Sequence, residues 1–419
     1  MLSTPDRLHT NQKHNSWAHR IREQFPILAE RINNHPLVYL DNAATTQKPI
    51  GVMDAVRSYN ETTHANVHRG VHELSRKATA ILEGVRANVA EYLNAQSREV
   101  VFTSGTTAAI NQVASALPDA FFAPGKTILI STLEHHSNML PWMFRARRTG
   151  CEVAPIPLDQ NGVPDEGKFA DLLSTKQVSI VAITHISNTL GLTVNLNSLV
   201  ALAHLHGALV LVDGAQAVGH MQPNPINYDA DFYVFGAHKM FGPTGVGVLW
   251  GKETYLKQLM PAFTGGGVIK SVSFSEVEYA ELPQYLEPGT PNIEGIVGLG
   301  AAIEFIQQTG WKVMHEQEKM LAGLLRSTLM DLEEIELYGS TAKEVPLFSF
   351  NIKGVHPFDT GTLLNEMGIA VRTGHHCTQP LMKFLGIPGT VRVSASIYNT
   401  EEEVVFLGNA LKKCIKLLR

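Results

Sequence analysis

Two neighbouring stretches decide the fold class of this chain: ALVLVDGAQAVGH at residues 208–220 and FYVFGAHKMFGPTG at residues 232–245. Each begins with a short apolar run and ends in a turn of small residues. The first turn carries Asp213 and the second carries Lys239. Apolar runs of this length, bounded by glycine, are typical of strands that are buried on both faces of a sheet. We therefore expect two buried strands, one ending in an aspartate and the other in a lysine.

The same alternation of apolar runs and helix-length segments extends from residue 100 to residue 250. Strands separated by helices are joined by crossovers, which give a mainly parallel sheet. Two of the helices expected between strands are Thr106–Ala116 and Asn195–His204. The strands are expected at Val100–Thr103, Thr127–Ser131, Ser179–Thr184, Ala208–Asp213, Phe232–Phe235 and Gly245–Trp250. This pattern predicts an α/β fold.

The pattern changes after about Gly289, where long helices and short strands replace the regular alternation. These elements are expected at Ile296–Gln308, Trp311–Leu332, Pro346–Ile352, Ala370–Arg372, Thr390–Ser394 and Glu401–Leu418. They predict a smaller α+β domain. We expect an N-terminal segment over residues 1–35, a large domain over residues 36–290 and the small domain over residues 291–419. A helix around Trp17–Phe25 is expected to pack the N-terminal segment against the small domain.

Composition excludes several classes of protein. The 419 residues are 44% hydrophobic and carry a formal net charge of −5, with no basic patch, which gives no electrostatic case for nucleic acid. No window has the length and apolarity of a membrane span. Cys151, Cys377 and Cys414 are scattered and form no C-x-x-C pair, which argues against a disulfide framework and a structural zinc site. The first 30 residues lack the apolar core of a signal peptide, so a cytoplasmic location is expected.

Three turns along the predicted sheet carry chemistry. Ser104-Gly105-Thr106-Thr107 opens a helix, where free N–H groups and the helix dipole favour a phosphate, although an ordinary N-cap has the same composition. Asp213 could keep a ring nitrogen protonated, as pyridoxal phosphate requires, or could cap a helix. Lys239 could form a Schiff base, although most lysines are simply exposed. Each signal is weak alone, and their order along the chain is the informative feature.

With this order established, the chain resembles group II (SufS/CsdA-type) cysteine desulfurases. These belong to the class V aminotransferase family of fold-type I enzymes that depend on pyridoxal 5′-phosphate. The resemblance runs from about Phe25 to Leu418 and implies a large domain with a mainly parallel, seven-stranded sheet. It is carried by the motifs YLDNAATT at residues 39–46, NVHRGVH at 66–72, EPGTPN at 287–292 and RTGHHC at 372–377.

The resemblance also implies residue roles. Lys239 would hold the cofactor, His135 would stack on its ring and shuttle protons, and Asp213 would bind the ring nitrogen. Asn188 and Gln216 would contact the ring oxygen side. The expected phosphate ligands are Thr106, Thr107 and His238, joined by Thr290 from the other subunit of a homodimer with shared sites. The expected substrate-binding residues are Arg392, which would clamp the carboxylate, together with Asn188, His68 and Arg372.

Cys377 reduces the number of reactions that this chain could catalyse. Fold-type I enzymes include aminotransferases, kynureninase-like hydrolases and epimerases, but desulfuration needs a thiolate that attacks the sulfur of bound cysteine. Arg372, His375 and His376 are cations or potential cations within five residues of Cys377. A buried structural cysteine is the alternative, against which the polar neighbours argue. We expect L-cysteine to become L-alanine and its sulfur to form a persulfide on Cys377. A selenocysteine lyase acting on L-selenocysteine, with Cys377 auxiliary, stays open.

A persulfide leaks or oxidises readily, so a SufE-, SufU- or CsdE-like acceptor protein is expected to take the sulfur. Iron–sulfur cluster assembly is the family's usual destination for it, and molybdenum cofactor or tRNA thiolation stay open. Two departures from the family concern the cofactor. Gly236 stands where a phosphate-binding serine is usual, and Ala108 stands where glutamate often follows the two threonines.

Three histidines invite a metal interpretation. His64, His68 and His72 are spaced by four residues, which would place them on one face of a helix. Val67, Gly70 and Val71 make a regular helix doubtful, and no carboxylate or cysteine completes a ligand set. We therefore expect no metal site there, and interpret the segment as a loop that reaches the neighbouring subunit's active site.

Overall fold

The computed structural model describes residues 17–339 and 345–419. Within these residues the chain forms two compact units, each described here by itself. The larger unit comprises Val52–Ile186 and Val194–Gln307. The smaller unit comprises Ser187–Thr193, Gln308–Arg419 and the described residues up to Gly51. Residues 1–16 of the expected N-terminal segment lie outside the described residues.

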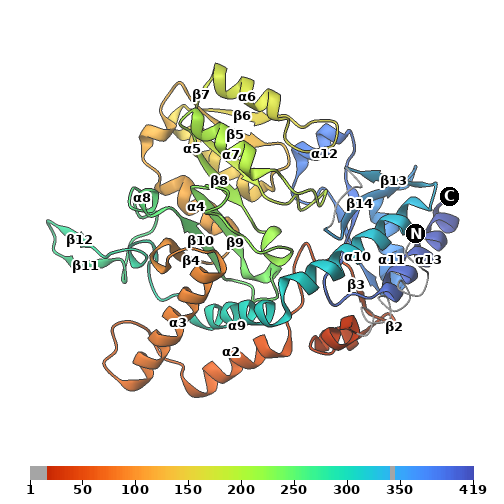
Figure 1. The fold of residues 1–419 in the computed structure, drawn as a ribbon, viewed down its shortest axis with the longest axis horizontal. Helices are drawn as coiled ribbons and strands as arrows, with labels where there is room; N and C mark the ends of the chain where they lie inside the picture. Colours follow the sequence, from red (N-terminus) through yellow and green to blue (C-terminus); the bar gives the residue numbers. More distant parts are fainter. Residues whose placement is uncertain (1–16, 340–344) are drawn as a thin grey trace. The chain divides into compact units, whose positions relative to one another are not determined.

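The larger unit is built on a seven-stranded sheet with the order β4-β10-β9-β8-β7-β5-β6 (Figure 1). Among the described residues, β10 pairs antiparallel with both of its neighbours, and the other six strands all run in the opposite direction to it. The strands are β4 (Val100–Thr103), β5 (Lys126–Ser131), β6 (Glu152–Ile156), β7 (Gln177–Thr184), β8 (Leu209–Asp213), β9 (Phe232–Gly236) and β10 (Gly247–Gly251).

Helices cover this sheet, and the two-stranded ribbon of β11 and β12 extends away from it (Figure 1). The ribbon is formed by β11 (Ile269–Val272) and β12 (Val277–Tyr279). The helices are α2 (Ile50–Thr62), α3 (Glu73–Tyr92), α4 (Thr106–Ala116), α5 (Leu140–Thr149), α6 (Glu166–Thr175), α7 (Leu196–Leu205), α8 (Glu253–Leu256) and α9 (Ile293–Thr309).

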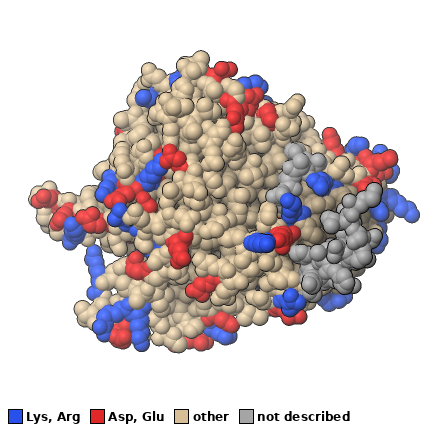
Figure 2. Space-filling view, in the orientation of Figure 1, with Lys and Arg blue, Asp and Glu red and all other residues tan. Residues whose placement is uncertain are grey.

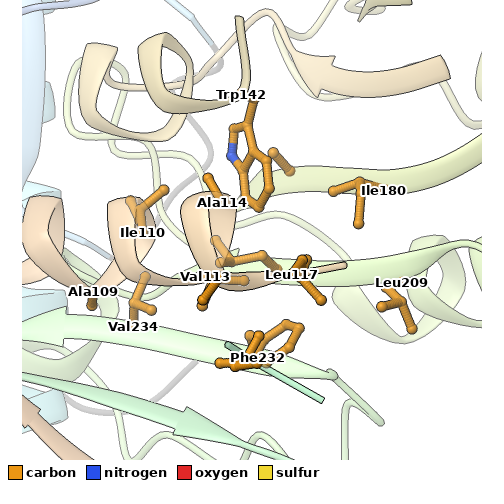
Figure 3. Close-up of a cluster of buried hydrophobic side chains, with 14 of the residues drawn as sticks. Ala109, Ile110, Val113, Ala114, Leu117, Trp142, Ile180, Leu209, Phe232 and Val234 are labelled. Carbon is orange, nitrogen blue, oxygen red and sulfur yellow. The ribbon is translucent and has the colours of Figure 1, made fainter. Parts of the chain in front are cut away.

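The core of the larger unit explains why α4 has a fixed position on the sheet. The apolar side chains of α4 pack between Trp142 and the side chains of the sheet, such as Phe232 and Val234 (Figure 3). Burying one such large apolar side chain contributes about 1.5–3 kcal/mol. Every residue of β8, β9 and β10 is buried, as a sheet covered on both faces requires.

The smaller unit contains a four-stranded antiparallel sheet with the order β13-β14-β17-β16. These strands are β13 (Ile335–Tyr338), β14 (Leu347–Ile352), β16 (Arg372–Gly374) and β17 (Thr390–Ser394). A separate parallel pair joins β3 (Val38–Tyr39) to β15 (Ile369–Ala370), and β1 (Arg31–Ile32) pairs with β2 (His35–Pro36). The helices are α10 (Trp311–Met330), α11 (Pro357–Glu366), α12 (Gln379–Leu385) and α13 (Glu401–Leu418).

The N-terminal helix of the described chain, over residues 17–22, belongs to this smaller unit. Arg22 Nη1 lies 2.8 Å from Glu403 Oε1 on α13, and the rings of Phe25 and Tyr398 have centroids 4.5 Å apart. These contacts tie the start of the described chain to its last helix.

The expected α/β fold, with a mainly parallel seven-stranded sheet and a smaller α+β unit, is confirmed. Several features differ from the sequence analysis, of which three concern the sheets and the division into units. The strands β6 and β13 were not expected, and α9, expected to open the smaller domain, groups with the larger unit up to Gln307. Its glycines explain this, because a Cβ at Gly298 would overlap the ring of Pro243, and one at Gly295 would overlap Val246.

Acidic and basic side chains are intermixed over the face of the molecule drawn in Figure 2. Among the helices that the structure describes, none combines the length and the apolarity needed to cross a membrane.

Candidate active site

The larger unit gathers five functional turns at one edge of its sheet. Because β4, β5, β7, β8 and β9 run in the same direction, their carboxyl ends lie along this edge, where ligands of open α/β sheets bind. The residues that follow these strands include Thr106, His135, His185, Asp213 and Lys239. The sheet therefore brings together residues that are far apart in the sequence.

The turn after β4 has the form of a phosphate site. Gly105 precedes α4 with a φ of 146°, and as a glycine it places no capping side chain over the first N–H groups of the helix. A Cβ at Gly236 would lie 3.2 Å from Thr106 Oγ1 and 3.3 Å from the ring of His238. Thr106 and His238 therefore flank the same point of the backbone. Open helix N–H groups, a hydroxyl and an imidazole are a suitable donor set for a phosphate.

His135 has a fixed ring orientation. Its Nδ1 accepts the Ser137 N–H at 3.1 Å, so the proton of the neutral ring lies on Nε2. The Ser137 hydroxyl lies 3.0 Å from the same Nδ1 and 2.7 Å from the Thr107 hydroxyl at the start of α4. His135 and Thr107 are thus joined through Ser137, and the ring is held in place before any ligand binds.

Asp213 is a buried carboxyl group at the end of β8. Its Oδ1 accepts the Ala215 N–H at 2.9 Å. Burial raises the pKa of Asp213, although the Ala215 N–H and the positive charge of Lys239 oppose that rise. A protonated ring nitrogen would add a positive partner that stabilises the buried carboxylate. Asp213 therefore fits the predicted contact with the cofactor ring.

Glu134 lies behind this site and was not assigned a role from the sequence. It is completely buried, and it accepts the Thr184 N–H at 2.7 Å and the Asn138 amide at 2.6 Å. Burial raises the pKa of Glu134 well above its ordinary value, and the charge of Asp213 adds to the rise. Burial thus disfavours a negative charge on Glu134, as it does on the neighbouring Asp213.

Lys239 ends the short helix η6 (Ala237–Lys239), directly after β9. Its carbonyl oxygen packs against Gly219 so closely that a Cβ at that glycine would overlap it. Gly219 ends η5 (Ala217–Gly219), whose preceding residue is the buried Gln216. The backbone around Lys239 is therefore held by the turn that follows Asp213.

His185 is an uncharged neighbour of this edge. Burial lowers the pKa of His185 to about 4, and its Nδ1 lies 3.0 Å from the Tyr233 hydroxyl. The ring is therefore neutral at physiological pH and adds no positive charge to this edge of the sheet.

The loop that carries Thr290 is anchored to α3 by a buried ion pair and to β4 by a hydrogen bond. Glu287 binds Arg86 through both carboxylate oxygens, at 2.6 and 2.9 Å, and Oε1 also accepts the Phe102 N–H at 2.6 Å. The exposed Thr290 lines a pocket of about 290 Å³ together with Ser104 and Ala108. The anchor thus keeps the Thr290 loop beside the phosphate turn.

We expect Arg86→Ala to lower the free energy of unfolding by about 3–5 kcal/mol, because it leaves Glu287 buried without its cation. Urea unfolding followed by circular dichroism measures this change. Arg76→Ala is the matched control, since Arg76 pairs with Glu73 on the surface and such pairs contribute about 0–1 kcal/mol. Equal losses in the two variants would contradict the anchoring role.

Cys377 lies in a loop of the smaller unit with an unusual backbone. His376 and Cys377 both have positive φ, at 51° and 58°, a region that non-glycine residues rarely adopt. The Asn188 amide donates to the His376 carbonyl at 2.9 Å, and the His376 ring lies 2.8 Å from the Thr390 hydroxyl. The loop is thus held on two sides, while the Cys377 side chain remains partly exposed.

One of the three expected cations near Cys377 is not a cation. Burial lowers the pKa of His376 to about 3, and the positive charge of Arg392 lowers it further. His376 is therefore neutral at physiological pH and supports the loop. His375 accepts the Cys377 N–H on its Nδ1 at 3.1 Å. Arg372 carries the permanent positive charge closest in sequence to the thiol.

Arg392 is a buried guanidinium on β17, with only 3% of its side chain exposed. Its Nη1 donates to the Asn188 carbonyl at 2.8 Å and its Nη2 donates to Asp41 at 3.1 Å. Its Nε is buried and has no hydrogen-bond partner among the described residues. Burial lowers the pKa of Arg392 to about 10, so the group stays charged at neutral pH. A buried cation with an unused donor fits an anionic ligand.

The sequence analysis gave no role to Asp41, which binds both Arg372 and Arg392. Its position inside the YLDNAATT motif was the available signal. The structure therefore adds a carboxylate to the predicted substrate-binding residues of the smaller unit.

The histidine segment at residues 64–72 is not helical, so His64, His68 and His72 do not share a helix face. His72 caps α3 by accepting the Ser75 N–H at 3.2 Å, and His68 has a φ of 70°. Among the described residues no group of histidine, cysteine, aspartate and glutamate side chains has the arrangement of a metal site.

Comparisons with known proteins identify the family of this chain. The sequence profile described as aminotransferase class-V matches residues 38–407. The chain belongs to the class V aminotransferase family. Members of this family depend on pyridoxal phosphate, and the donor set at the sheet edge fits that cofactor.

Three proteins similar to this chain are named as cysteine desulfurases. A probable cysteine desulfurase of Halalkalibacterium halodurans is 43% identical over 399 residues, which are 94% of this chain and 97% of that protein. The apo structure of a cysteine desulfurase from Thermococcus onnurineus has a TM-score of 0.90 at 37% identity, covering 95% of this chain and 98% of the other. The structure of the cysteine desulfurase CsdA (S-sulfonic acid) from Escherichia coli has a TM-score of 0.88 at 36% identity, covering 96% and 99%.

Proposed function

We propose that this protein is a cysteine desulfurase that converts L-cysteine to L-alanine and holds the released sulfur as a persulfide on Cys377. One observation carries the proposal. Within the smaller unit, Asn188 donates its amide to the loop of Cys377 and accepts from Arg392 through its carbonyl. Asn188 therefore connects the loop that carries the Cys377 thiol with Arg392, the buried cation assigned to the substrate carboxylate.

Pyridoxal phosphate supplies an electron sink next to the substrate Cα when it is bound. Thr106, Thr107 and His238 are assigned to its phosphate and Asp213 to its ring nitrogen. Asn188 and Gln216 are assigned to the ring oxygen side. These assignments are supported by the open start of α4, the contact of Gly236 with Thr106 and His238, and the buried charge of Asp213.

Three side chains of the protein have separate roles in the proposed reaction. Lys239 would hold the cofactor, and its amine would move protons at the substrate carbons. His135, whose neutral ring presents Nε2–H, would lie beside the cofactor ring and exchange a proton with the substrate. Arg392 binds the carboxylate, so that the substrate sulfur is presented to Cys377.

The sulfur-transfer step is a nucleophilic displacement. The Cys377 thiolate attacks the substrate sulfur, an S–S bond forms, and the bond between that sulfur and the substrate Cβ breaks. The electron pair of the broken bond stays with the substrate carbons, which take up protons and leave as alanine. Cys377 retains the sulfur at the persulfide level, so no external oxidant is needed.

The proposal extends to the assembly and the acceptor. Thr290 and His68 are exposed in the larger unit, which is consistent with roles in a second subunit's site within a homodimer. The partly exposed Cys377 suits transfer of the sulfur to a SufE-, SufU- or CsdE-like acceptor in the cytoplasm, for iron–sulfur cluster assembly.

A direct test measures alanine released from L-cysteine by the purified protein, together with the mass of the Cys377 peptide under non-reducing conditions. We expect alanine formation and a mass increase of one sulfur atom on that peptide. Alanine formation with no added sulfur on Cys377 would overturn the persulfide assignment, and no alanine formation would overturn the proposed activity.

For Arg392, we expect the substitution Arg392→Lys to raise KM for L-cysteine about 10-fold or more, because an ammonium group cannot make the bidentate contact. The absorbance of the bound cofactor should not change. Arg147→Lys makes the same substitution on the exposed side of α5 and should leave KM unchanged. An unaltered KM in Arg392→Lys would remove Arg392 from the substrate site.

A further inference from the structure

Asp41 accepts hydrogen bonds from two arginines at once. Arg372 donates to it through Nε at 3.1 Å to each oxygen and through Nη2 at 2.9 Å. Arg392 donates to Oδ1 through Nη2 at 3.1 Å. Two permanent positive charges therefore share a single carboxylate, and the trio carries one net positive charge.

The two arginines differ in what they need from Asp41. Arg372 has about half of its side chain exposed, so water can solvate it. Arg392 is almost completely buried, and it also donates to the neutral Asn188 carbonyl. A buried guanidinium without a counter-ion is costly, whereas a half-exposed one is not. Asp41 is thus the negative charge that allows Arg392 to remain buried.

The backbone of Asp41 is fixed with respect to Arg392. Asp41 forms a parallel bridge with Ser394, two residues after Arg392 on β17. Its carbonyl accepts the Ala44 N–H at 3.1 Å and the Tyr39 hydroxyl at 3.3 Å. The Asp41 carboxylate is therefore presented to Arg392 from a backbone position that is hydrogen-bonded beside β17, as preorganised recognition requires.

We propose that Asp41 is a positioning residue for the substrate carboxylate: it orients Arg392 and cancels one of the two arginine charges, leaving one positive charge for the amino-acid substrate. This inference rests on the proposed function, because it takes Arg392 as the site of the carboxylate. When the substrate binds Arg392, Asp41 keeps its bonds to Arg372 and does not become a buried unpaired anion.

Removing the carboxylate has a specific consequence. Without Asp41, two guanidinium groups with no shared counter-ion would attract small anions from the buffer. Chloride would then compete with the carboxylate of L-cysteine, so KM would depend on the chloride concentration. In the native protein Asp41 occupies that position, and millimolar chloride should have little effect.

The test compares the holoenzyme forms of the native protein, Asp41→Asn and Asp41→Glu at 10 and 200 mM chloride. For Asp41→Asn we expect KM for L-cysteine to rise about 10- to 100-fold, as for loss of a hydrogen bond to a charged group, and to rise further with chloride. The kcat should change less than about threefold, since the reacting groups are untouched. Asp41→Glu, which keeps the charge, should recover most of the affinity.

A second readout does not depend on turnover. The dissociation constant of L-cysteine, taken from the absorbance change of the bound cofactor in a Cys377→Ala background, should rise by the same factor in Asp41→Asn. Asp331→Asn makes the same chemical change at an exposed site of the smaller unit and should alter neither quantity.

The charge-balanced double variant Asp41→Asn/Arg372→Gln keeps the proposal testable even if Asp41→Asn folds poorly. It again leaves one net positive charge, so its KM should lose the chloride dependence, while Arg372→Gln alone should raise KM without chloride dependence. Such non-additivity is the signature of directly coupled groups.

Unchanged KM in Asp41→Asn, or chloride dependence that persists in the double variant, would overturn the role of Asp41. These outcomes require that the native protein releases alanine from L-cysteine. If the native protein fails to do so, the proposed function fails instead, so the two failures are distinguishable.

Discussion

The substitution Cys377→Ala is expected to lower the rate of alanine release from L-cysteine by at least about 10³-fold, as loss of a catalytic nucleophile does. The reason is that a Cβ–S bond does not break readily unless a second thiolate accepts the sulfur. The backbone around Cys377 should not change, because its loop is held through the His376 carbonyl and ring and not through the thiol.

Alanine quantification with L-cysteine and with L-selenocysteine measures this effect and separates the two candidate activities. Selenium leaves more easily, so we expect the variant to retain much of its activity toward L-selenocysteine. Cys151→Ala is the matched control, since the Cys151 thiol donates to the Lys126 carbonyl at 3.1 Å in the larger unit and has no assigned role. Full L-cysteine activity in Cys377→Ala would contradict the nucleophile assignment and favour a lyase in which Cys377 is auxiliary.

The second large effect concerns Lys239. Lys239→Ala should lose at least about 10³-fold in activity, because the residue both anchors the cofactor and moves protons. The ring contacts and the phosphate contacts do not require Lys239, so the variant should still bind pyridoxal phosphate, but reversibly. Dialysis should therefore remove the absorbance band from Lys239→Ala and leave it in the native protein.

Lys257→Ala provides the control for Lys239→Ala. Lys257 is exposed and pairs with Glu253 one helical turn earlier, so its loss should affect neither the band nor the rate. A band in Lys239→Ala that survives dialysis, and that borohydride converts into a stable pyridoxyl adduct on a peptide without residue 239, would show that another lysine carries the cofactor.

The placement of Asp213 and Lys239 at one edge of the sheet could be predicted from sequence, because it follows from the order of strands and turns along the chain. Asp213 and Lys239 each end an apolar run, and parallel strands place such ends at one edge of a sheet. The strand β6 was missed because its residues are less uniformly apolar, with Glu152 exposed at its start. The boundary at α9 depended on close packing of glycines, which no periodicity reveals.

Two features of the smaller unit could not be predicted from the sequence: the charge state of His376 and the position of Asp41. His376 is adjacent to Cys377 and could have been a cation, but its burial makes it neutral. Asp41 is more than 300 residues from Arg372 and Arg392, and only the pairing of strands in three dimensions brings it to them. Charge states and long-range pairs depend on tertiary burial, so local sequence patterns leave them open.

Gly236, which stands where the family usually has a serine, lies in a closely packed part of the structure. A Cβ there would lie 3.2 Å from Thr106 Oγ1 and 3.3 Å from the His238 ring, which is closer than an ordinary van der Waals contact. A serine at this position would need these two neighbours to shift by a few tenths of an ångström. The close packing of Thr106 and His238, the two residues assigned to the phosphate, is thus compatible with a glycine at residue 236 and disfavours a serine there.

Asn188 holds the Cys377 loop with its side chain and Arg392 with its backbone carbonyl. Substrate binding at Arg392 and the conformation of the Cys377 loop therefore share one contact residue. If the two equilibria are coupled through it, each must change the other by the same factor. To the extent that binding of the amino acid stabilises one position of the loop, the position of the loop changes the affinity for the amino acid by the same factor. An enzyme whose cysteine is loaded with sulfur, and whose loop has moved, would then bind its next substrate with a different affinity, which would set the order of loading and unloading.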